Sequence, residues 1–299
     1  MSKYKNIGII ACDLRQVHMA KFLVNKGYNI DLCCSEKLFH NKDFKESMYN
    51  LVHNDIFSDL KIVYDIEDIL NISQVIVAPI PFNKISEFMV IPKFISLLNE
   101  REDSSSILLY AGCIDDDAKI ILNETNINYI DYYLSDKLAI YNSIATAEGI
   151  IAEAILSKDT NLHGSRALIL GYGKCGKTLA DKLKGLNVNV SICCRREEDL
   201  ALGNSLGFNA ISIHNLIMEI KDYDYIFNTI PCMILSDEIL QKISKDSIIF
   251  DIASLPGGVD KNAANKYNIT VKHSLGLPGK YAPRSSGIAL AKDLLHYIS

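Results

Sequence analysis

The sequence lacks three features that would each indicate a class of protein. No run of Lys and Arg is long enough to form a nucleic-acid face, and the net charge of the 299 residues is −5. None of the eight cysteines has the Cys-x-x-Cys spacing of a zinc or dithiol site. The first apolar run stops at Asp13, too early for a signal peptide or a membrane span. We therefore expect a cytoplasmic protein that binds neither nucleic acid nor a membrane.

The cysteines that are present include two adjacent pairs. Cys33-Cys34 and Cys193-Cys194 each end an apolar run typical of a strand, YNIDLCC and VNVSICC. Adjacent cysteines are poorly placed to bind one ion together, whereas Cys is a common small apolar residue in buried strands. We predict buried cysteines, no metal site and a reducing compartment.

Apolar and helical segments alternate along the chain in a way that predicts an α/β protein. A length of 299 residues suggests two domains, at about 150 residues each. From residue 166 onward, short apolar runs alternate with segments of helical spacing, which is typical of a parallel sheet covered on both faces. The first half repeats this pattern more loosely. Its helix over 87–98 carries Pro92 and is predicted to be kinked or broken there, whereas residues 35–66 receive no assignment.

We therefore predict two doubly wound parallel-sheet domains joined by helices. Residues 1–141 form a substrate-binding α/β domain, and 142–284 a Rossmann NAD(P)-binding domain that a helix over 142–157 enters. The amphipathic C-terminal helix, 285–299, is expected to pack at the domain junction. A cleft between two such domains is the usual place for a cofactor to meet a substrate.

The segment GYGKCGKT matches two phosphate-binding patterns at once. Gly171, Gly173 and Gly176 form the dinucleotide fingerprint Gly-x-Gly-x-x-Gly. Gly171, Gly176, Lys177 and Thr178 equally match the loop of nucleoside triphosphatases. The strand SIIFD supplies a terminal Asp for magnesium in the second interpretation, but such strands are common in any doubly wound sheet.

The surroundings of this segment favour the dinucleotide interpretation. The apolar run ALIL precedes the glycines, the helical segment KTLADKL follows them, and a second strand ends about 20 residues later. Gly171 then makes the tight turn, Gly173 lets the backbone approach the pyrophosphate, and Gly176 lets helix and strand pack closely. Lys177 and Thr178 are ordinary residues of the first helical turn in this interpretation.

The residues after the second strand predict which cofactor binds. An NAD site usually has a carboxylate there for the ribose 2′-hydroxyl. This chain instead has Arg195 and Arg196, and its first acid is Glu197. Guanidinium groups suit a 2′-phosphate, so we predict NADP(H), with NAD(H) left open because Glu197 can serve the hydroxyl.

Six short motifs, in matching order over nearly the whole chain, resemble those of the A subunit of dipicolinate synthase. They are DLRQ at 13–16, TAEG at 146–149, GYGKCGK from Gly171, NTIP at 228–231, DIASLPGG at 251–258 and LGLPGKYAP at 275–283. The last two are the most specific, because a glycine fingerprint alone indicates only a broad superfamily.

The resemblance implies an activity, a partner and a setting. Dipicolinate synthase of spore-forming bacteria makes pyridine-2,6-dicarboxylate by oxidising a dihydro- or hydroxytetrahydrodipicolinate. Its A subunit is similar in architecture to D-2-hydroxyacid dehydrogenases and adenosylhomocysteine hydrolase, and it works with a flavoprotein-like B subunit. We accordingly expect a nicotinamide-dependent oxidoreductase in the mother cell, and a homo-oligomer.

A substrate with two carboxylates requires fixed donors, and the motifs supply candidates. Arg15 follows the first strand, at the edge where such sheets open toward ligands, and its planar fork suits a carboxylate; a surface ion pair with Asp13 is the alternative. The residues expected at the substrate are Asp13, Arg15, Gln16, Thr146, Gly257 and Gly258. The residues expected at the cofactor are Gly171, Gly173, Lys174, Cys175, Gly176, Arg195, Arg196, Thr229, Pro231, Gly276 and Pro278.

Three residues are candidates for proton transfer. Lys280 is expected in a turn, LPGK, and can also bind a carboxylate. Glu148, near the start of the interdomain helix, can orient Arg15 or act as a base, and a capping role together with Thr146 is equally simple. His273 ends the last strand and can face the cleft.

Two other functions compete with dipicolinate synthesis. A reductase of 2-hydroxy or 2-keto acids needs an arginine and an acid–histidine pair in the cofactor domain. Arg195 and Arg196 come too early for that role, and the sequence offers His273 no evident acidic partner, so we rank this function second. A nucleotide-sensing partner protein without turnover of its own is third.

Overall fold

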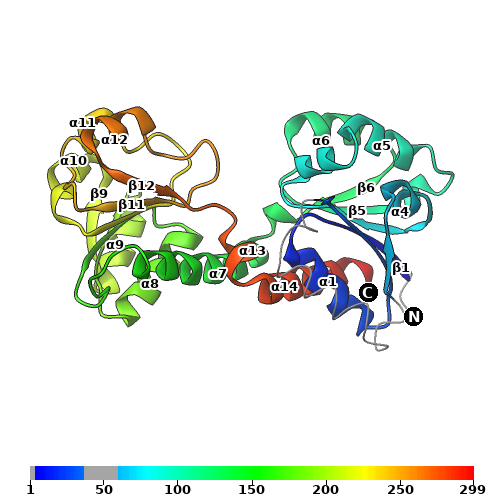
Figure 1. Cartoon of the computed structure of the whole chain (residues 1–299), viewed down its shortest axis with the longest axis horizontal. Helices are drawn as coiled ribbons and strands as arrows, with labels where there is room; N and C mark the ends of the chain where they lie inside the picture. The colour runs from blue at the N-terminus through cyan, green and yellow to red at the C-terminus, as the bar shows by residue number, and fades with distance from the viewer. Residues whose placement is uncertain (1–3, 37–59) are drawn as a thin grey trace. The chain divides into compact units, whose positions relative to one another are not determined.

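The computed structural model of the chain describes residues 4–36 and 60–299, which form two compact units (Figure 1). Unit 1 comprises Met1–Tyr141 together with Pro283–Ser299. Unit 2 comprises Asn142–Ala282. Each unit is an α/β sandwich around its own parallel sheet, so the predicted fold class is confirmed.

Unit 1 contains a six-stranded parallel sheet in the order β3-β2-β1-β4-β5-β6. Its strands are β1 (Asn6–Ala11), β2 (Asn29–Cys34), β3 (Leu60–Val63), β4 (Val75–Val77), β5 (Leu108–Ala111) and β6 (Asn128–Asp131). Its helices are α1 (Leu14–Val24), α4 (Ile66–Ile72), α5 (Ile91–Asn99), α6 (Asp116–Asn123) and α14 (Pro283–Ile298). This is the doubly wound order of Rossmann folds, in which ligands bind where the order reverses, here between β1 and β4.

Alternation along each strand of unit 1 divides its side chains between two cores. Ile9 of β1 belongs to the core that α1 and α14 cover, whereas Ile10 belongs to the core under α4, α5 and α6. Figure 1 shows these helices on opposite faces of the sheet. Cys34 and Cys33 follow the same alternation, and burial raises the pKa of each thiol, to about 12 and about 11. The prediction that these cysteines are buried is confirmed.

Unit 2 repeats the same topology, in the order β12-β11-β10-β7-β8-β9. Its strands are β7 (Arg166–Leu170), β8 (Asn189–Cys194), β9 (Asn209–Ser212), β10 (Tyr225–Asn228), β11 (Ile248–Asp251) and β12 (Thr270–His273). Its helices are α8 (Lys174–Gly185), α9 (Glu197–Ser205), α10 (Leu216–Glu219), α11 (Asp237–Leu240), α12 (Lys261–Tyr267) and α13 (Leu277–Tyr281). The carboxyl ends of β7 and β10 meet at its switch point, directly beside the glycine loop.

The long helix α7 (Asp136–Ile155) begins earlier than the sequence indicated. No Gly or Pro interrupts residues 136–148, so the helix extends six residues before the predicted start at 142. Among the described residues it is the one helix long and apolar enough to cross a membrane. Its apolar residues Ala147, Ile150 and Ala154 instead lie in the core of unit 2.

Several elements of unit 1 differ from the sequence prediction. The helix predicted over 87–98 is broken: a 3₁₀ turn ends at Glu87, and α5 starts at Ile91 with Pro92 in its first turn, where a missing N–H costs nothing. Strand β6 was not predicted, since its four residues are too short for a periodic signal. Strand β3 and the start of α4 fall in the unassigned region, whose residues 37–59 lie outside the described part of the chain.

The C-terminal helix α14 is part of the core of unit 1. Leu290, Ala291 and Leu294 lie in one buried cluster with Met19 and Leu23 of α1. The two helices approach closely at Gly287, where a Cβ would collide with the carbonyl oxygen of Arg15. This helix therefore returns the end of the chain to the domain that contains its beginning.

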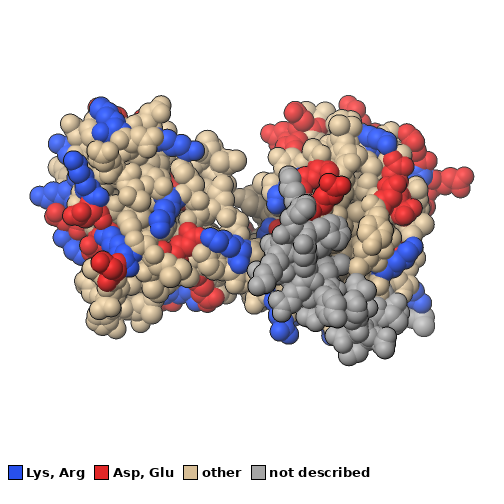
Figure 2. Space-filling model, viewed as in Figure 1, with Lys and Arg blue, Asp and Glu red and all other residues tan. Residues whose placement is uncertain are grey.

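Charge is distributed differently over the two units. On the face that Figure 2 shows, acidic side chains gather over the α5 and α6 side of unit 1. Over α8 and α9 of unit 2, basic and acidic side chains lie side by side. Several cations of unit 2 form ion pairs with carboxylates, among them Lys177, Lys182 and Arg196.

Candidate functional site

The loop between β7 and α8 has the geometry of a dinucleotide-binding turn. Gly171 has a φ of +95°, and a Cβ there would collide with the Thr229 hydroxyl. A Cβ at Gly176 would collide with the Gly171 carbonyl oxygen, so this glycine lets α8 approach the end of β7. A Cβ at Gly173, the N-cap of α8, would meet no described atom within 4 Å, and no side chain caps the helix. Open space at a helix N-terminus fits a pyrophosphate.

The two residues that distinguish a triphosphate loop are engaged elsewhere. The Lys177 ammonium lies 3.1 Å from a carboxylate oxygen of Asp199 and 5.3 Å from the centre of the Tyr172 ring. The Thr178 hydroxyl lies 2.7 Å from that of Ser143. A triphosphate loop needs this lysine on the phosphates and this hydroxyl on magnesium. The geometry favours the dinucleotide interpretation.

The end of β8 carries the two arginines expected at the cofactor. Arg195 is exposed and makes no hydrogen bond or ion pair within the described part of the chain. Arg196 precedes α9, and its guanidinium binds Asp199 through Nε at 2.7 Å and through a terminal nitrogen at 2.6 Å. The sequence indicated only Glu197 as an acid of interest here. Asp199 was missed, because only the helical turn of α9 brings it back to Arg196.

The carboxyl ends of β10, β11 and β12 form a connected polar edge in unit 2. The Asn228 amide donates to the Asp251 carboxylate at 2.8 Å, and both side chains are almost fully buried. The other oxygen of Asp251 lies 3.6 Å from Nδ1 of His273, at the end of β12. The prediction that His273 has no acidic partner is therefore wrong: residues 22 positions apart become neighbours because β11 and β12 pair in register, Asp251 beside His273.

The glycines of DIASLPGG bring their loop onto this edge. Gly257 has a φ of +85°, and a Cβ there would lie 2.6 Å from the Asp251 carboxylate. The Gly258 amide donates to that carboxylate at 3.1 Å, and a Cβ on Gly258 would collide with Asn228. Both glycines are thus explained by contacts inside unit 2, and their contact with a substrate stays a prediction.

A second polar cluster centres on Glu153 of α7, which was not predicted from the sequence. Its carboxylate accepts hydrogen bonds from the Lys280 ammonium at 2.7 Å, from the Tyr281 hydroxyl at 3.0 Å and from the Ser274 hydroxyl. Glu153 raises the pKa of Lys280 through a hydrogen bond, so this lysine is held as a cation. Lys280 is therefore better suited to attract an anion than to accept a proton. The segment LPGK is the start of the short helix α13 and not a turn, and the residue with positive φ is Gly276, at +67°.

Thr146 and Glu148 lie inside α7, about ten residues from its start at Asp136. The alternative that they cap a helix is therefore wrong, because a cap must precede the first turn. The exposed Glu148 forms an ion pair with Lys182 of α8, with 2.9 Å between the charged atoms. Arg15 belongs to unit 1 and Glu148 to unit 2, and the hypothesis that Glu148 orients Arg15 stays a prediction.

In unit 1, the DLRQ motif forms the N-terminus of α1 at the end of β1. Asp13 caps the helix, accepting from the Arg15 amide, while the Gln16 side chain accepts from the Asp13 amide. The Arg15 guanidinium binds the Asp13 carboxylate at 2.6 Å, and its side chain is only 10% exposed. Burial alone would raise the pKa of Asp13, but the charge and hydrogen bonds of Arg15 outweigh it and hold that pKa below its usual value.

Gln16 has an unsatisfied group beside this ion pair. Its side-chain nitrogen is buried and has no hydrogen-bond partner among the described residues. A buried donor without a partner carries a cost in free energy, which a bound acceptor would remove. The motif therefore offers a cation and an amide donor at the switch point of the unit 1 sheet, as a carboxylate site requires.

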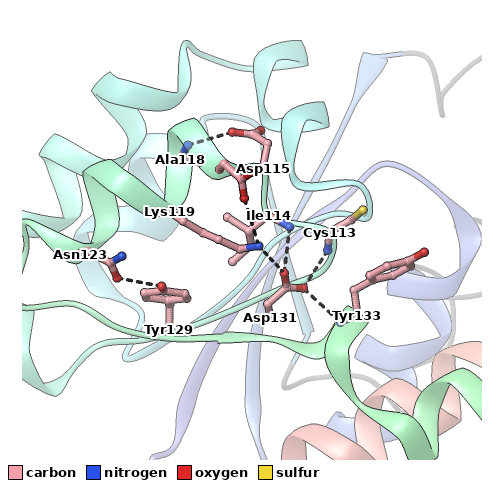
Figure 3. A network of polar contacts seen from close by, with 10 residues as sticks. Cys113, Ile114, Asp115, Ala118, Lys119, Asn123, Tyr129, Asp131 and Tyr133 are labelled. Atoms are coloured by element: carbon pink, nitrogen blue, oxygen red, sulfur yellow. Dashed lines mark hydrogen bonds and ion pairs between the residues drawn. The ribbon is translucent and has the colours of Figure 1, made fainter. Parts of the chain in front are cut away.

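A buried carboxylate orders the next part of the same edge (Figure 3). Asp131, at the end of β6, accepts from the amides of Cys113 at 2.9 Å, Ile114 at 3.2 Å and Tyr133 at 3.1 Å. The Lys119 ammonium lies 3.7 Å away, and the Asp131 side chain is 4% exposed. These contacts fix the loop after β5. The only sign of this role in the sequence is that the acidic Asp131 follows the segment INYI.

The remaining predicted residues have clear positions. Lys174 and Cys175 form the first turn of α8, and Pro231 is exposed after β10. Thr229 donates its hydroxyl to the Leu170 carbonyl oxygen at 2.9 Å, beside the glycine turn. Gly276 precedes α13 and Pro278 lies in its first turn. The predicted cofactor residues thus all belong to unit 2, and the DLRQ residues to unit 1.

This architecture defines the class of protein: two doubly wound domains of Rossmann topology, the second with a dinucleotide-type glycine turn. A transhydrogenase from Sinorhizobium meliloti shares the fold, with a TM-score of 0.67 at 17% identity over 97% of this chain and 92% of that one. No protein-family model matches the sequence.

Within this class, the chain resembles the A subunit of dipicolinate synthase, as its motifs indicated. It is 40% identical to the A subunit from Bacillus subtilis (strain 168) over 159 residues, 53% of this chain and 54% of the relative. In this alignment the chain spans about half of the relative's length. The crystal structure of the A subunit of dipicolinate synthase from Bacillus halodurans matches 99% of this chain and 98% of its own, with a TM-score of 0.84 at 26% identity.

Proposed function

We propose that this chain is the nicotinamide-binding component of an oxidoreductase that forms pyridine-2,6-dicarboxylate. The observation that carries the proposal is the likeness to a dipicolinate synthase A chain over nearly the whole length. The glycine loop of this chain, with its open helix N-terminus, supports it. The substrate would be dihydrodipicolinate, or hydroxytetrahydrodipicolinate after loss of water. Aromatisation removes one hydride, which the cofactor accepts, and one proton, which passes to a base.

The residues of the two units support different roles in binding the cofactor and the substrate. In unit 2, the turn at Gly171, Gly173 and Gly176 would hold the pyrophosphate at the N-terminus of α8. In unit 1, Arg15 and the Gln16 amide would bind a substrate carboxylate, with Asp13 orienting the guanidinium. In unit 2, Lys280, held as a cation by Glu153, would attract a carboxylate.

The end of β8 supports NADP as the cofactor. The exposed Arg195 has a full positive charge and no partner among the described residues, so it is available to a 2′-phosphate. Of the described acids that directly follow β8, Glu198 and Asp199 are paired with Arg196. Glu197 would therefore have to reach the 2′-hydroxyl for NAD to be preferred.

The setting follows from the resemblance alone. The relatives are named as one part of a synthase, so we propose that a second, flavoprotein-like B subunit is the partner and that this chain itself forms a homo-oligomer. On the same ground we propose that the protein acts in the cytoplasm of the mother cell.

A spectroscopic assay tests the proposal. The protein is mixed with dihydrodipicolinate and either NADP⁺ or NAD⁺, with and without the B subunit, and the absorbance of the pyridine dicarboxylate is followed. Its appearance with the cofactor and its absence without the cofactor are expected. Tight cofactor binding with no turnover, even with the B subunit, would contradict the proposal and would support a nucleotide-sensing function.

One observation favours a second candidate. The neighbouring Asp251 and His273 supply the acid–histidine pair that a reductase of 2-keto acids needs. Reduction of such acids by NADPH, in the same cuvette and without dihydrodipicolinate, would support this activity over the first.

A further inference from the structure

Two cations bind a single buried carboxylate where β8 meets α9. Asp199 is in the first turn of α9, and its side chain is 8% exposed. One oxygen lies 3.1 Å from the Lys177 ammonium. The other accepts from Arg196 through two nitrogens, at 2.7 and 2.6 Å. Arg195, a third cation, adjoins Arg196 in the chain.

Both oxygens of Asp199 are therefore used inside unit 2. Burial alone would raise the pKa of Asp199, but the hydrogen bonds and charges of Lys177 and Arg196 outweigh it and keep the carboxyl ionised. A buried carboxylate that already accepts from two cations has little capacity left for a ribose hydroxyl. Asp199 is thus not placed as the acid of an NAD site, although it lies near the expected position.

The contacts of Asp199 link the two elements that would border the adenine ribose. Lys177 is on α8, one residue after Gly176, and also lies over the Tyr172 ring. Arg196 ends the turn after β8. The acids Glu197 and Glu198 are exposed, and Glu198 lies 3.2 Å from Arg196. Glu197 and Glu198 thus face solvent, whereas the buried Asp199 fixes the guanidinium of Arg196 from the side of the core.

We propose that Asp199 is a positioning residue that determines cofactor specificity. It holds Lys177 and Arg196 beside Arg195, so that the end of β8 presents a cationic surface to a phosphate on the ribose 2′-oxygen. The inference rests on the proposed dinucleotide site and adds the residue that makes this site select NADP.

Calorimetric titration of the full chain tests this role, with NADP⁺, NAD⁺ and adenosine 2′,5′-bisphosphate as probes. Asp199→Asn retains the size of the side chain but loses the charge that orders the two cations. We expect its affinity for NADP⁺ and for the bisphosphate to fall roughly tenfold or more, the scale of one charged hydrogen bond. Its affinity for NAD⁺ should change by less than about twofold.

A matched control is Asp237→Asn. Asp237 also pairs with a lysine of unit 2, Lys266, at 2.8 Å, but it is on α11, away from the glycine loop. This variant should leave all three affinities unchanged. If Asp199→Asn unfolds, Lys177→Gln and Arg196→Gln, which leave the carboxylate in place, should each weaken NADP⁺ binding and spare NAD⁺ binding.

The possible outcomes separate the inference from the proposed function. Wild-type preference for NADP⁺ that persists unchanged in Asp199→Asn overturns the positioning role alone. Weaker NAD⁺ binding by this variant, with NADP⁺ binding retained, would mean that Asp199 accepts the ribose hydroxyl. Wild-type protein that binds neither dinucleotide overturns both the inference and the proposed site.

Discussion

The ring of Tyr281 occupies the space that a side chain at Gly149 would need. A Cβ at Gly149 would lie 2.6 Å from Cδ2 of the ring and 3.1 Å from Cγ. The Tyr281 hydroxyl is fixed one turn further along α7 by its hydrogen bond to Glu153. Two motifs far apart in the sequence, TAEG and LGLPGKYAP, therefore meet at one contact between α7 and α13.

This contact predicts the effect of Gly149→Ala. Alanine favours a helix by about 1 kcal/mol over glycine, but forcing a Cβ against the Tyr281 ring costs roughly 1–3 kcal/mol. We expect a net loss of stability, measured as a lower urea midpoint. Gly185→Ala is the control, because a Cβ on this α8 glycine would meet no described atom within 4 Å, and it should be neutral or stabilising. Gly149→Ala that is as stable as this control would contradict the tight packing.

Glu153 predicts a dependence of stability on pH. Burial alone would raise its pKa, but the hydrogen bonds from Lys280, Ser274 and Tyr281 outweigh it, so the folded pKa lies below the usual 4.5. A carboxyl with a depressed pKa contributes stability above the unfolded value, and this contribution is lost as pH falls through the folded value.

Denaturation at a series of pH values measures this contribution. Between about pH 5 and pH 3, wild type should lose more stability than Glu153→Gln, which has no charge to protonate. Glu148→Gln serves as the comparison, since this exposed acid on the same helix has a single ion pair among the described residues. If the stability of wild type and of Glu153→Gln depended on pH in the same way, the polar cluster around Glu153 would not be maintained in solution.

The two parallel sheets could be predicted from the sequence because buried strands give strong apolar runs at regular intervals. Strand β6 could not, since its four residues include Asn128 and Asp131 and lack such a run. The start of α7 was placed too late, because residues 136–141 carry exposed apolar side chains such as Ile140 and Tyr141 that obscure the helical period.

Lys280 is predicted to act as a cation and not as a base. Its hydrogen bond to Glu153 raises its pKa, so it stays charged throughout the neutral range. Lys280→Met should raise KM for the substrate by about tenfold or more, and Lys280→Arg should restore much of it. The pH profile of kcat/KM should keep its shape in Lys280→Arg; a lost limb would mean that Lys280 transfers a proton.

Arg15 is predicted to bind a substrate carboxylate. Arg15→Lys keeps the charge but loses the planar fork, so KM should rise while the affinity for the cofactor stays near wild type. Since Arg15 is buried against Asp13, the melting temperature of each variant must be measured alongside. Arg284→Lys, an exposed arginine of unit 1, should change neither quantity. An unchanged KM in folded Arg15→Lys would exclude the assignment.

The glycine loop could be found from the sequence because its spacing is fixed by backbone geometry within eight residues. Asp199, Glu153 and Asp131 could not, because each acquires its role from partners that only the fold brings near. Asp251 and His273 illustrate the difference, since the register of β11 and β12 makes them neighbours. Local sequence patterns predicted where a phosphate binds. Which charged side chains are paired around that site could be seen only in the structure.

The pair formed by Asp251 and His273 yields the last prediction. If His273 accepts the proton released on oxidation, His273→Asn should lower kcat by at least about a hundredfold, the usual contribution of a general base. The affinity for NADP⁺ should stay within about twofold, because His273 is not expected at the phosphates. His214→Asn, at a histidine of the same unit outside this pair, is the control and should be fully active. Asp251→Asn should also lower kcat, since it removes the charge beside the imidazole, although its bonds to Asn228 and Gly258 require a check of folding.

Both histidine variants are assayed with dihydrodipicolinate and with a 2-keto acid. Loss of activity toward the keto acid alone would assign this pair to the second candidate function, and full activity of His273→Asn toward both substrates would remove His273 from the chemistry.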